Sequence, residues 1–151
     1  MILVPAACES GSEGPRRAAV DPSEPCSILS PAVVEGALGT EVRGEHESES
    51  RPGPRGPVPL CLYSMGAPYS TLTVHVEHPV TRDEFTKRMN RDLRNAEPID
   101  DLADAAYIHG GISLLLLQGE TVVGASLQHF EDIEETRNDL VRIGREAAER
   151  I

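Results

Sequence analysis

The sequence of 151 residues contains few aromatic side chains, a single lysine and no long apolar run. Aromatic residues make up 3% of the chain and tryptophan is absent, so a hydrophobic core must be built mostly from aliphatic side chains. No apolar run approaches the ~20 residues that a membrane-spanning helix requires. The longest candidate, residues 112–117, has the length of a strand.

Basic residues are also scarce. The chain has 14 lysine and arginine residues against 25 aspartate and glutamate residues, which gives a formal net charge of -11. Binding to nucleic acid needs clustered lysine and arginine, and binding to anionic lipid headgroups needs a basic patch. The charge therefore argues against a nucleic-acid partner and indicates a solvated acidic surface.

Composition divides the chain into a tether and one domain. Residues 9–25 are rich in Ser, Gly, Pro, Glu and Arg and contain little to bury, which is typical of a flexible linker. The length of the chain leaves room for one modest domain besides this tether. We therefore expect a single α+β domain over residues 26–151.

Helix signals occur at three places in this domain. A helix is expected between Ser30, which can cap it, and Gly39, which can end it. Thr81 and Glu84 match the capping-box pattern at the start of a second helix. The last segment, residues 131–151, places apolar residues on one stripe and arginines in its latter half, as the helix dipole favours.

Strand patterns lie between these helices. Residues 60–65, 70–78 and 106–109 are each expected to form a strand, the second with alternating aliphatic and polar side chains. Residues 112–130 contain two β-prone runs around a Gln-Gly-Glu turn, which predicts an antiparallel hairpin. Residues 40–58 are polar and rich in Pro and Gly, so we expect a long loop that could hold a short edge strand near residues 41–48. The order of elements predicts an α+β fold, with an antiparallel β-sheet packed on one face by helices, including a C-terminal helix.

Cys26 and Cys61 leave two interpretations open. Both thiols could be free and buried, because cysteine often packs as a small hydrophobe. Alternatively, they form a disulfide that ties the entry of the first helix to the sheet, which would stabilise the fold by about 3–4 kcal/mol through the entropy of the unfolded chain. Cytosolic proteins rarely keep such a bond, so the second interpretation requires export.

The third cysteine, Cys8, follows two alanines and a short aliphatic stretch, and the tether comes after it. This pattern is typical of the end of a bacterial lipoprotein signal, where a peptidase cuts before a lipid-bearing cysteine. Pro5 stands where leucine is usual, and an upstream start would explain the missing charged and apolar regions. We expect residues 1–8 to be a partial lipoprotein signal with Cys8 as the lipid attachment site; the alternative is a short cytoplasmic N-terminus.

Residues with metal-binding or catalytic potential are scattered. His75 and His78 flank Glu77, but on a strand the two histidines would face opposite sides, and zinc would need a further ligand such as His109 or His129. Neither a Gly-x-Ser-x-Gly elbow nor an established phosphate-binding glycine loop occurs in the sequence. We therefore expect no metal, no cofactor and no enzymatic activity.

A cluster of carboxylates precedes Tyr107. Asp100, Asp101 and Asp104 could do acid–base work if burial raised the pKa of one of them. Carboxylates at such positions also cap turns and face water, and this is the role that we expect for them.

Leu114, Leu115, Leu116 and Leu117 form a continuous aliphatic run. Such a run is typical of a central strand that is buried on both faces. Alternatively, one face of the strand lines an apolar groove, which makes these leucines a possible binding strand. A binding domain would show a concave apolar patch near this strand, whereas an enzyme would show at least two titratable groups converging in a pocket.

Three segments occur in the order seen in a known family. Residues 21–39, "DPSEPCSILSPAVVEGALG", resemble the opening of the DUF3558 family of actinobacterial lipoproteins, and residues 102–128 resemble its strand pair. The family's Cys-x-Trp motif corresponds here to Cys61–Leu62–Tyr63. The resemblance covers about residues 21–151. Tyr63 could still pack beside a disulfide, with its hydroxyl on a polar neighbour.

The resemblance implies a small extracytoplasmic domain with a Cys26–Cys61 bond and a lipid on Cys8, and it implies no catalytic set. We therefore expect a non-catalytic cell-envelope lipoprotein, held on the outer face of the cell membrane by its N-terminal lipid. Its expected role is to bind an envelope protein partner or a small apolar ligand. The alternative is a regulatory lipoprotein that restrains an envelope sensor, and a hydrolase comes third.

Overall fold

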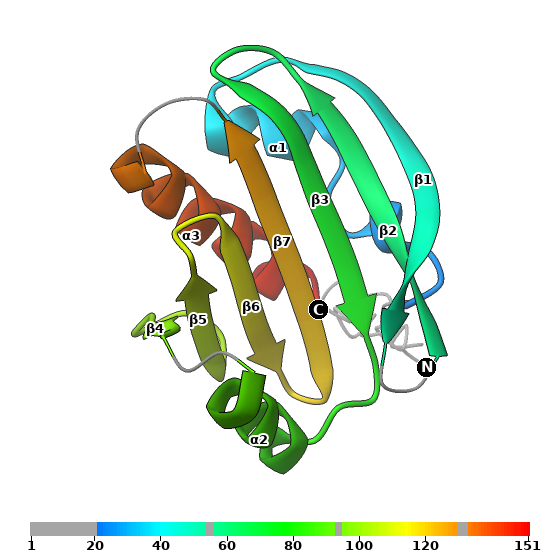
Figure 1. Ribbon diagram of the computed structural model, residues 1–151. Coiled ribbons are helices and arrows are strands. Elements are labelled where there is room, and N and C mark those ends of the chain that lie inside the picture. The colour runs from blue at the N-terminus through cyan, green and yellow to red at the C-terminus, as the bar shows by residue number, and fades with distance from the viewer. Residues whose placement is uncertain (1–20, 54–55, 93–94, 130–132) are drawn as a thin grey trace, which may run out of the picture.

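The computed structural model describes residues 21–53, 56–92, 95–129 and 133–151, which Figure 1 shows as coloured ribbon. The expected α+β fold is confirmed: within the described chain, seven strands form one antiparallel sheet and three α-helices pack against it. In chain order the elements are η1 (Pro25–Ser27), α1 (Pro31–Leu38), β1 (Val42–Gly53), β2 (Gly56–Met65), β3 (Tyr69–Glu77), α2 (Arg82–Asp92), β4 (Glu97–Pro98), β5 (Ala105–His109), β6 (Ser113–Gln118), β7 (Thr121–His129) and α3 (Ile133–Arg150).

The strands lie in the order β1-β2-β3-β7-β6-β5-β4, and each neighbouring pair is antiparallel. The hairpin expected from the sequence is formed by β6 and β7, which turn through Gly119 and Glu120. Gly119 has a φ of +61°, in the left-handed region that favours glycine. The hairpin lies inside the sheet, because β7 pairs with β3 on one side and β6 pairs with β5 on the other.

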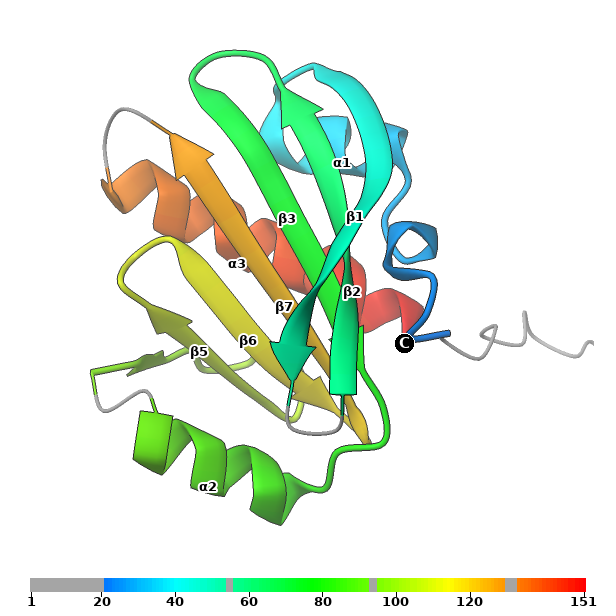
Figure 2. The same ribbon diagram turned by 45° about the vertical axis from the view of Figure 1, so that its right-hand side comes forward.

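Helices α1 and α3 cover one face of the sheet, as expected (Figures 1 and 2). The main core lies beneath them and is mostly aliphatic, with Leu72, Val74, Leu127 and Ile143 fully buried. Helix α3 packs its apolar stripe into this core, and the polar side of the helix faces solvent. None of the described helices is long and apolar enough to cross a bilayer.

Helix α2 lies on the other face of the sheet, which the sequence did not indicate. It crosses one end of that face, as the turned view in Figure 2 shows. Phe85 and Met89 of α2 pack there with Val80, Leu117 and Val122 in a second, smaller core. The rest of this face is not covered by a helix of the described chain, and we call it the open sheet face.

The edge strand expected near residues 41–48 is present as part of β1, which runs on through Gly53, and β2 begins at Gly56, so strands replace most of the long loop expected over residues 40–58. Strand β1 is a twelve-residue edge strand that pairs with β2 alone. An edge strand faces solvent, so it tolerates the charges and prolines that made this segment resemble a loop. Its register shifts near Gly44 and between Ser48 and Arg51, and Figure 2 shows the strong twist of the β1–β2 ribbon.

Two bonds tie the segment before α1 to β2. The Sγ atoms of Cys26 and Cys61 are 2.03 Å apart in a disulfide, so the second interpretation of these cysteines is the one that the structure contains. The buried Tyr63 hydroxyl donates a hydrogen bond of 2.6 Å to the Leu29 carbonyl, which is the polar neighbour anticipated for it. Burial raises the pKa of the Tyr63 hydroxyl well above its usual value.

Candidate functional site

The candidate site begins where β2 and β3 stop pairing. Their ladder ends at the Leu60–His75 pair, although β2 continues to pair with β1 as far as Gly56. Pro57 and Pro59 occupy the part of β2 beyond this point, and proline has no N–H to donate to a neighbouring strand. The end of β2 therefore stays with β1 and separates from β3.

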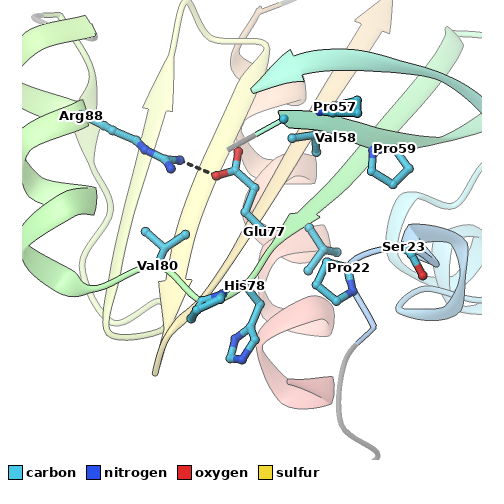
Figure 3. Close-up of a pocket in the computed structure, with 12 residues that line it drawn as sticks. Pro22, Ser23, Pro57, Val58, Pro59, Glu77, His78, Val80 and Arg88 are labelled. Carbon is cyan, nitrogen blue, oxygen red and sulfur yellow. Dashed lines mark hydrogen bonds and ion pairs between the residues drawn. The ribbon is translucent and has the colours of Figure 1, made fainter. Parts of the chain in front are cut away.

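A groove of about 370 Å³ lies at the separated ends of the two strands (Figure 3). This volume is near the lower end of the ~300–1,000 Å³ typical of ligand pockets. Valine and proline side chains form most of the walls. Four segments supply them: residues 22–23 before η1, residues 56–59 of β2, residues 76–80 at and after the end of β3, and Arg88 of α2.

An ion pair marks the α2 side of the groove, opposite Pro22 in Figure 3. Arg88 Nη1 donates to Glu77 Oε2 at 2.5 Å, and His75 Nε2 lies 3.8 Å from Glu77 Oε1. The side chains of His75, Glu77 and Arg88 are 8%, 11% and 19% exposed, so the ion pair is largely removed from water. It holds α2 against β3 and sets the charge at this end of the groove.

Hydrogen bonds also hold the segment that follows β3. The Val80 N–H donates to the Glu120 carbonyl at 2.7 Å, and His78 Nδ1 lies 3.0 Å from Thr121 Oγ1. The Val80 side chain is buried and packs with Phe85 of α2. Contacts within the chain therefore hold this wall of the groove in place.

A smaller hollow of about 180 Å³ lies on the open sheet face. Its polar lining consists of His75, Tyr107 and His109 with Ser113 and Ser126. Three titratable side chains thus meet at one place, as expected of an enzyme. However, the hydroxyls of Ser113 and Ser126 bond each other at 2.9 Å, whereas a serine nucleophile needs a hydrogen bond to a general base. The hollow is also smaller than most ligand pockets, so the groove at the ends of β2 and β3 is the better candidate of the two.

The four leucines of the possible binding strand divide between the two faces of the sheet. Leu114 and Leu116 lie in the main core, and Leu117 packs in the smaller core under α2. Leu115 is partly exposed and lines the smaller hollow. Most of the run is therefore buried as in a central strand, and the larger groove lies away from it, at the end of β3.

The aspartates before β5 have turn roles. Asp104 accepts a hydrogen bond of 2.7 Å from the Gly119 N–H, and Asp101 has a φ of +58°, a conformation that aspartate tolerates in turns. Across the residues that the structure describes, no group of three or more His, Cys, Asp or Glu could hold a metal ion. Cys8 and the rest of residues 1–20 lie outside the described part of the chain.

Sequence reasoning missed the groove because its walls come from four separate segments. The one local signal was the alternation of Pro57 and Pro59 immediately before the strand expected over residues 60–65, since two prolines on one edge of a strand prevent pairing with a further strand. No family model matches the chain, and no curated protein matches it. The resemblance to the DUF3558 family is therefore carried by the motifs alone and stays a prediction.

Proposed function

We propose that this chain is a non-catalytic, lipid-anchored domain of the cell envelope whose groove between β2 and β3 binds a small apolar ligand. The groove itself is the observation that carries the proposal. Its walls are mostly valine and proline, and burial of a ligand's apolar surface is favourable by about 25 cal/mol per Å². The few polar groups, with the Glu77–Arg88 pair among them, suffice to orient a ligand.

The disulfide supports a location outside the reducing cytosol. Bonds such as Cys26–Cys61 persist in oxidising compartments and are rare in cytosolic proteins. This bond also affects the groove. Pro22 and Ser23, which line the groove, come just before Cys26 in the chain. Fixing Cys26 to β2 therefore helps to position one wall.

Residues 9–20 of the expected tether support an anchored domain, whereas residues 21–25 belong to the described part of the chain, with Pro25 buried in η1. The described chain begins at Asp21, next to the groove residue Pro22. With a lipid on Cys8, residues 9–20 would connect the bilayer to the groove, and a chain of that length spans at most about 40 Å. The groove would then stay close to the membrane surface.

The sequence also leaves open that the groove binds a protein partner, such as an envelope sensor that the domain restrains. Stable protein interfaces bury about 1,200–2,000 Å² in total. A groove of this volume offers room for only a few side chains, so a small ligand is the better fit.

A photo-reactive side chain tests the proposal. We place p-benzoylphenylalanine at Pro57, which is exposed at the groove wall, and at Ala32, which is exposed on α1, as the control. The full chain is irradiated in cells of its native host, and adducts are identified by mass spectrometry. An adduct of small mass confined to position 57 supports the proposal. The absence of an adduct at position 57, equal adducts at both positions, or a protein-sized adduct would overturn it.

A further inference from the structure

The side of the groove formed by α2 carries a guanidinium within a strongly acidic protein. Helix α2 carries four cations, Arg82, Lys87, Arg88 and Arg91, against three acids, whereas the whole chain has a net charge of -11. Arg88 is the one of these cations that lines the groove. Its guanidinium has five N–H donors, and the bond to Glu77 is made through Nη1. Glu77 also lines the groove and takes up one of these donors, so an anionic ligand head would share the guanidinium with Glu77 through the remaining N–H groups.

The walls of the groove favour an alkyl chain over a peptide. Pro57 and Pro59 have no N–H, and Val58 and Val80 present only aliphatic side chains. Peptides that add to a sheet bind through main-chain hydrogen bonds. A peptide laid between β2 and β3 would find donors on the β3 side alone, whereas an alkyl chain needs none.

We propose that the groove binds a medium-chain fatty acid, with the carboxylate at Arg88 and the chain along Val58 and Val80. This inference rests on the proposed function, since it names a ligand class for the same groove. Arginine pairs with carboxylates through charge-assisted hydrogen bonds. A single arginine suits one carboxylate charge better than the roughly -1.5 to -2 charge of a phosphate monoester.

The groove also sets the chain length. The groove volume of about 370 Å³ is near the lower end for ligand pockets, so it suits a medium chain better than a long one. Affinity should therefore rise with chain length until the groove is full and then level off. The expected gain is about four-fold in Kd per methylene, the factor that corresponds to the usual free energy of burying one.

A chain-length series tests the inference on the full chain carrying Cys8→Ser, which cannot be lipidated at that position. Binding of saturated fatty acids from hexanoate to dodecanoate and of their methyl esters is measured by isothermal titration calorimetry. We expect the stepwise gain in affinity, and an acid that binds at least ten-fold more tightly than its ester.

Arginine variants separate the head group from the chain. In Arg88→Gln the affinity for the acid should fall to the affinity for its ester, and the dependence on chain length should remain. Arg88→Lys should keep part of the preference for the acid. The matched control is Arg137→Gln. Arg137 lies on α3, away from the groove, and its Nη2 atom is 2.6 Å from Glu97 Oε1. This variant should bind like the parent protein. If Arg88→Gln fails to fold, Arg88→Lys carries the comparison of acid with ester.

Three results would overturn the inference: equal affinities for acid and ester, an undiminished preference for the acid in Arg88→Gln, or no binding of any fatty acid. The crosslinking experiment distinguishes this failure from that of the proposed function. If position 57 still captures a small molecule that is not a fatty acid, the groove is a binding site and only the ligand class is wrong. If it captures nothing, the proposed function fails as well.

Discussion

The imidazole ring of His75 lies against Gly124 of the neighbouring strand, where an added Cβ atom on Gly124 would come within 1.9 Å of the ring's Cε1 atom. The two residues form a cross-strand pair between β3 and β7, and His75 is buried. Glycine is therefore required here for space. The packing holds His75 beside Glu77, whose carboxylate in turn binds Arg88 at the groove.

Gly124→Ala is expected to lower the free energy of unfolding by about 1–3 kcal/mol, as overpacking does. This loss outweighs the advantage of roughly 0.5–1 kcal/mol that alanine otherwise has over glycine within a strand. Urea unfolding followed by circular dichroism measures the change. In the double variant Gly124→Ala/His75→Ala the methyl group has room, so the two substitutions should couple strongly.

Gly36→Ala serves as the control for this prediction. Gly36 is exposed on α1, and nothing lies within 4 Å of the position of an added Cβ. Alanine should stabilise the helix there by about 1 kcal/mol. A Gly124→Ala variant that gains stability to the same extent would contradict the packing described for His75.

The Cys26–Cys61 disulfide is expected to contribute about 3–4 kcal/mol to the free energy of unfolding, because it closes a long loop in the unfolded chain. The sequence separation of the two cysteines is 35. The double variant Cys26→Ala/Cys61→Ala should show this loss in urea unfolding, and the parent protein in reductant should behave in the same way. Cys8→Ser should leave the stability unchanged. If both thiols of the secreted protein react with an alkylating agent without reductant, the bond is absent and the prediction fails.

Stability should decline at alkaline pH because of Tyr69. Its buried hydroxyl donates a hydrogen bond to Asp139, which also accepts one from Arg142 at 2.6 Å. Burial, together with this hydrogen bond to Asp139, raises the pKa of Tyr69 above its usual value of about 10. A tyrosine with a raised pKa in the folded state stabilises the fold fully below about pH 10, and this contribution is lost as the pH rises toward the folded value.

Tyr69→Phe tests this pH dependence. We expect it to cost about 1 kcal/mol at neutral pH, since a buried hydrogen bond is lost, and to make the decline above about pH 10 shallower. Urea unfolding between about pH 8 and pH 11 measures both effects. Tyr107→Phe, whose ring is partly exposed on the open sheet face, is the control. Parallel curves for the parent protein and Tyr69→Phe over this range would show that Tyr69 is not responsible.

Lipid attachment is expected at Cys8. Labelled palmitate fed to cells that express the full chain should be incorporated into the protein and lost in Cys8→Ser. Cys26→Ala/Cys61→Ala should keep the label, which separates lipid attachment from the other two cysteines. A parent protein without label would end the anchoring part of the proposed function and leave the groove untouched.

Several elements were predictable because the signals that form them are local. The Ser30 side chain accepts a hydrogen bond from the Val33 N–H at the start of α1, and Gly39 ends the helix with a φ of +64°. The Glu84 N–H likewise bonds Thr81 Oγ1 at the start of α2. Each of these bonds joins residues that are close in the chain, so the residue types and their spacing are enough to indicate it.

The sequence does not show in the same way which distant strand or sheet face each element packs against. Strand β1 owes its extended conformation to hydrogen bonds with β2, although its own residues favour a loop. The side of the sheet that α2 covers depends on where Phe85 finds the apolar side chains of β6 and β7. A local pattern shows that a helix has an apolar face, but not which distant surface will bury it.

The chain alone thus specified an acidic, mostly aliphatic α+β domain, its main helices and hairpin, and the two cysteines that could be joined. The groove arose only when residues from four segments met, at the point where prolines in β2 end the pairing with β3. Backbone capping and side-chain alternation act over a few residues, and they leave a pattern in the sequence. A cavity depends on the separation of segments that are remote in the chain, so no short pattern encodes it.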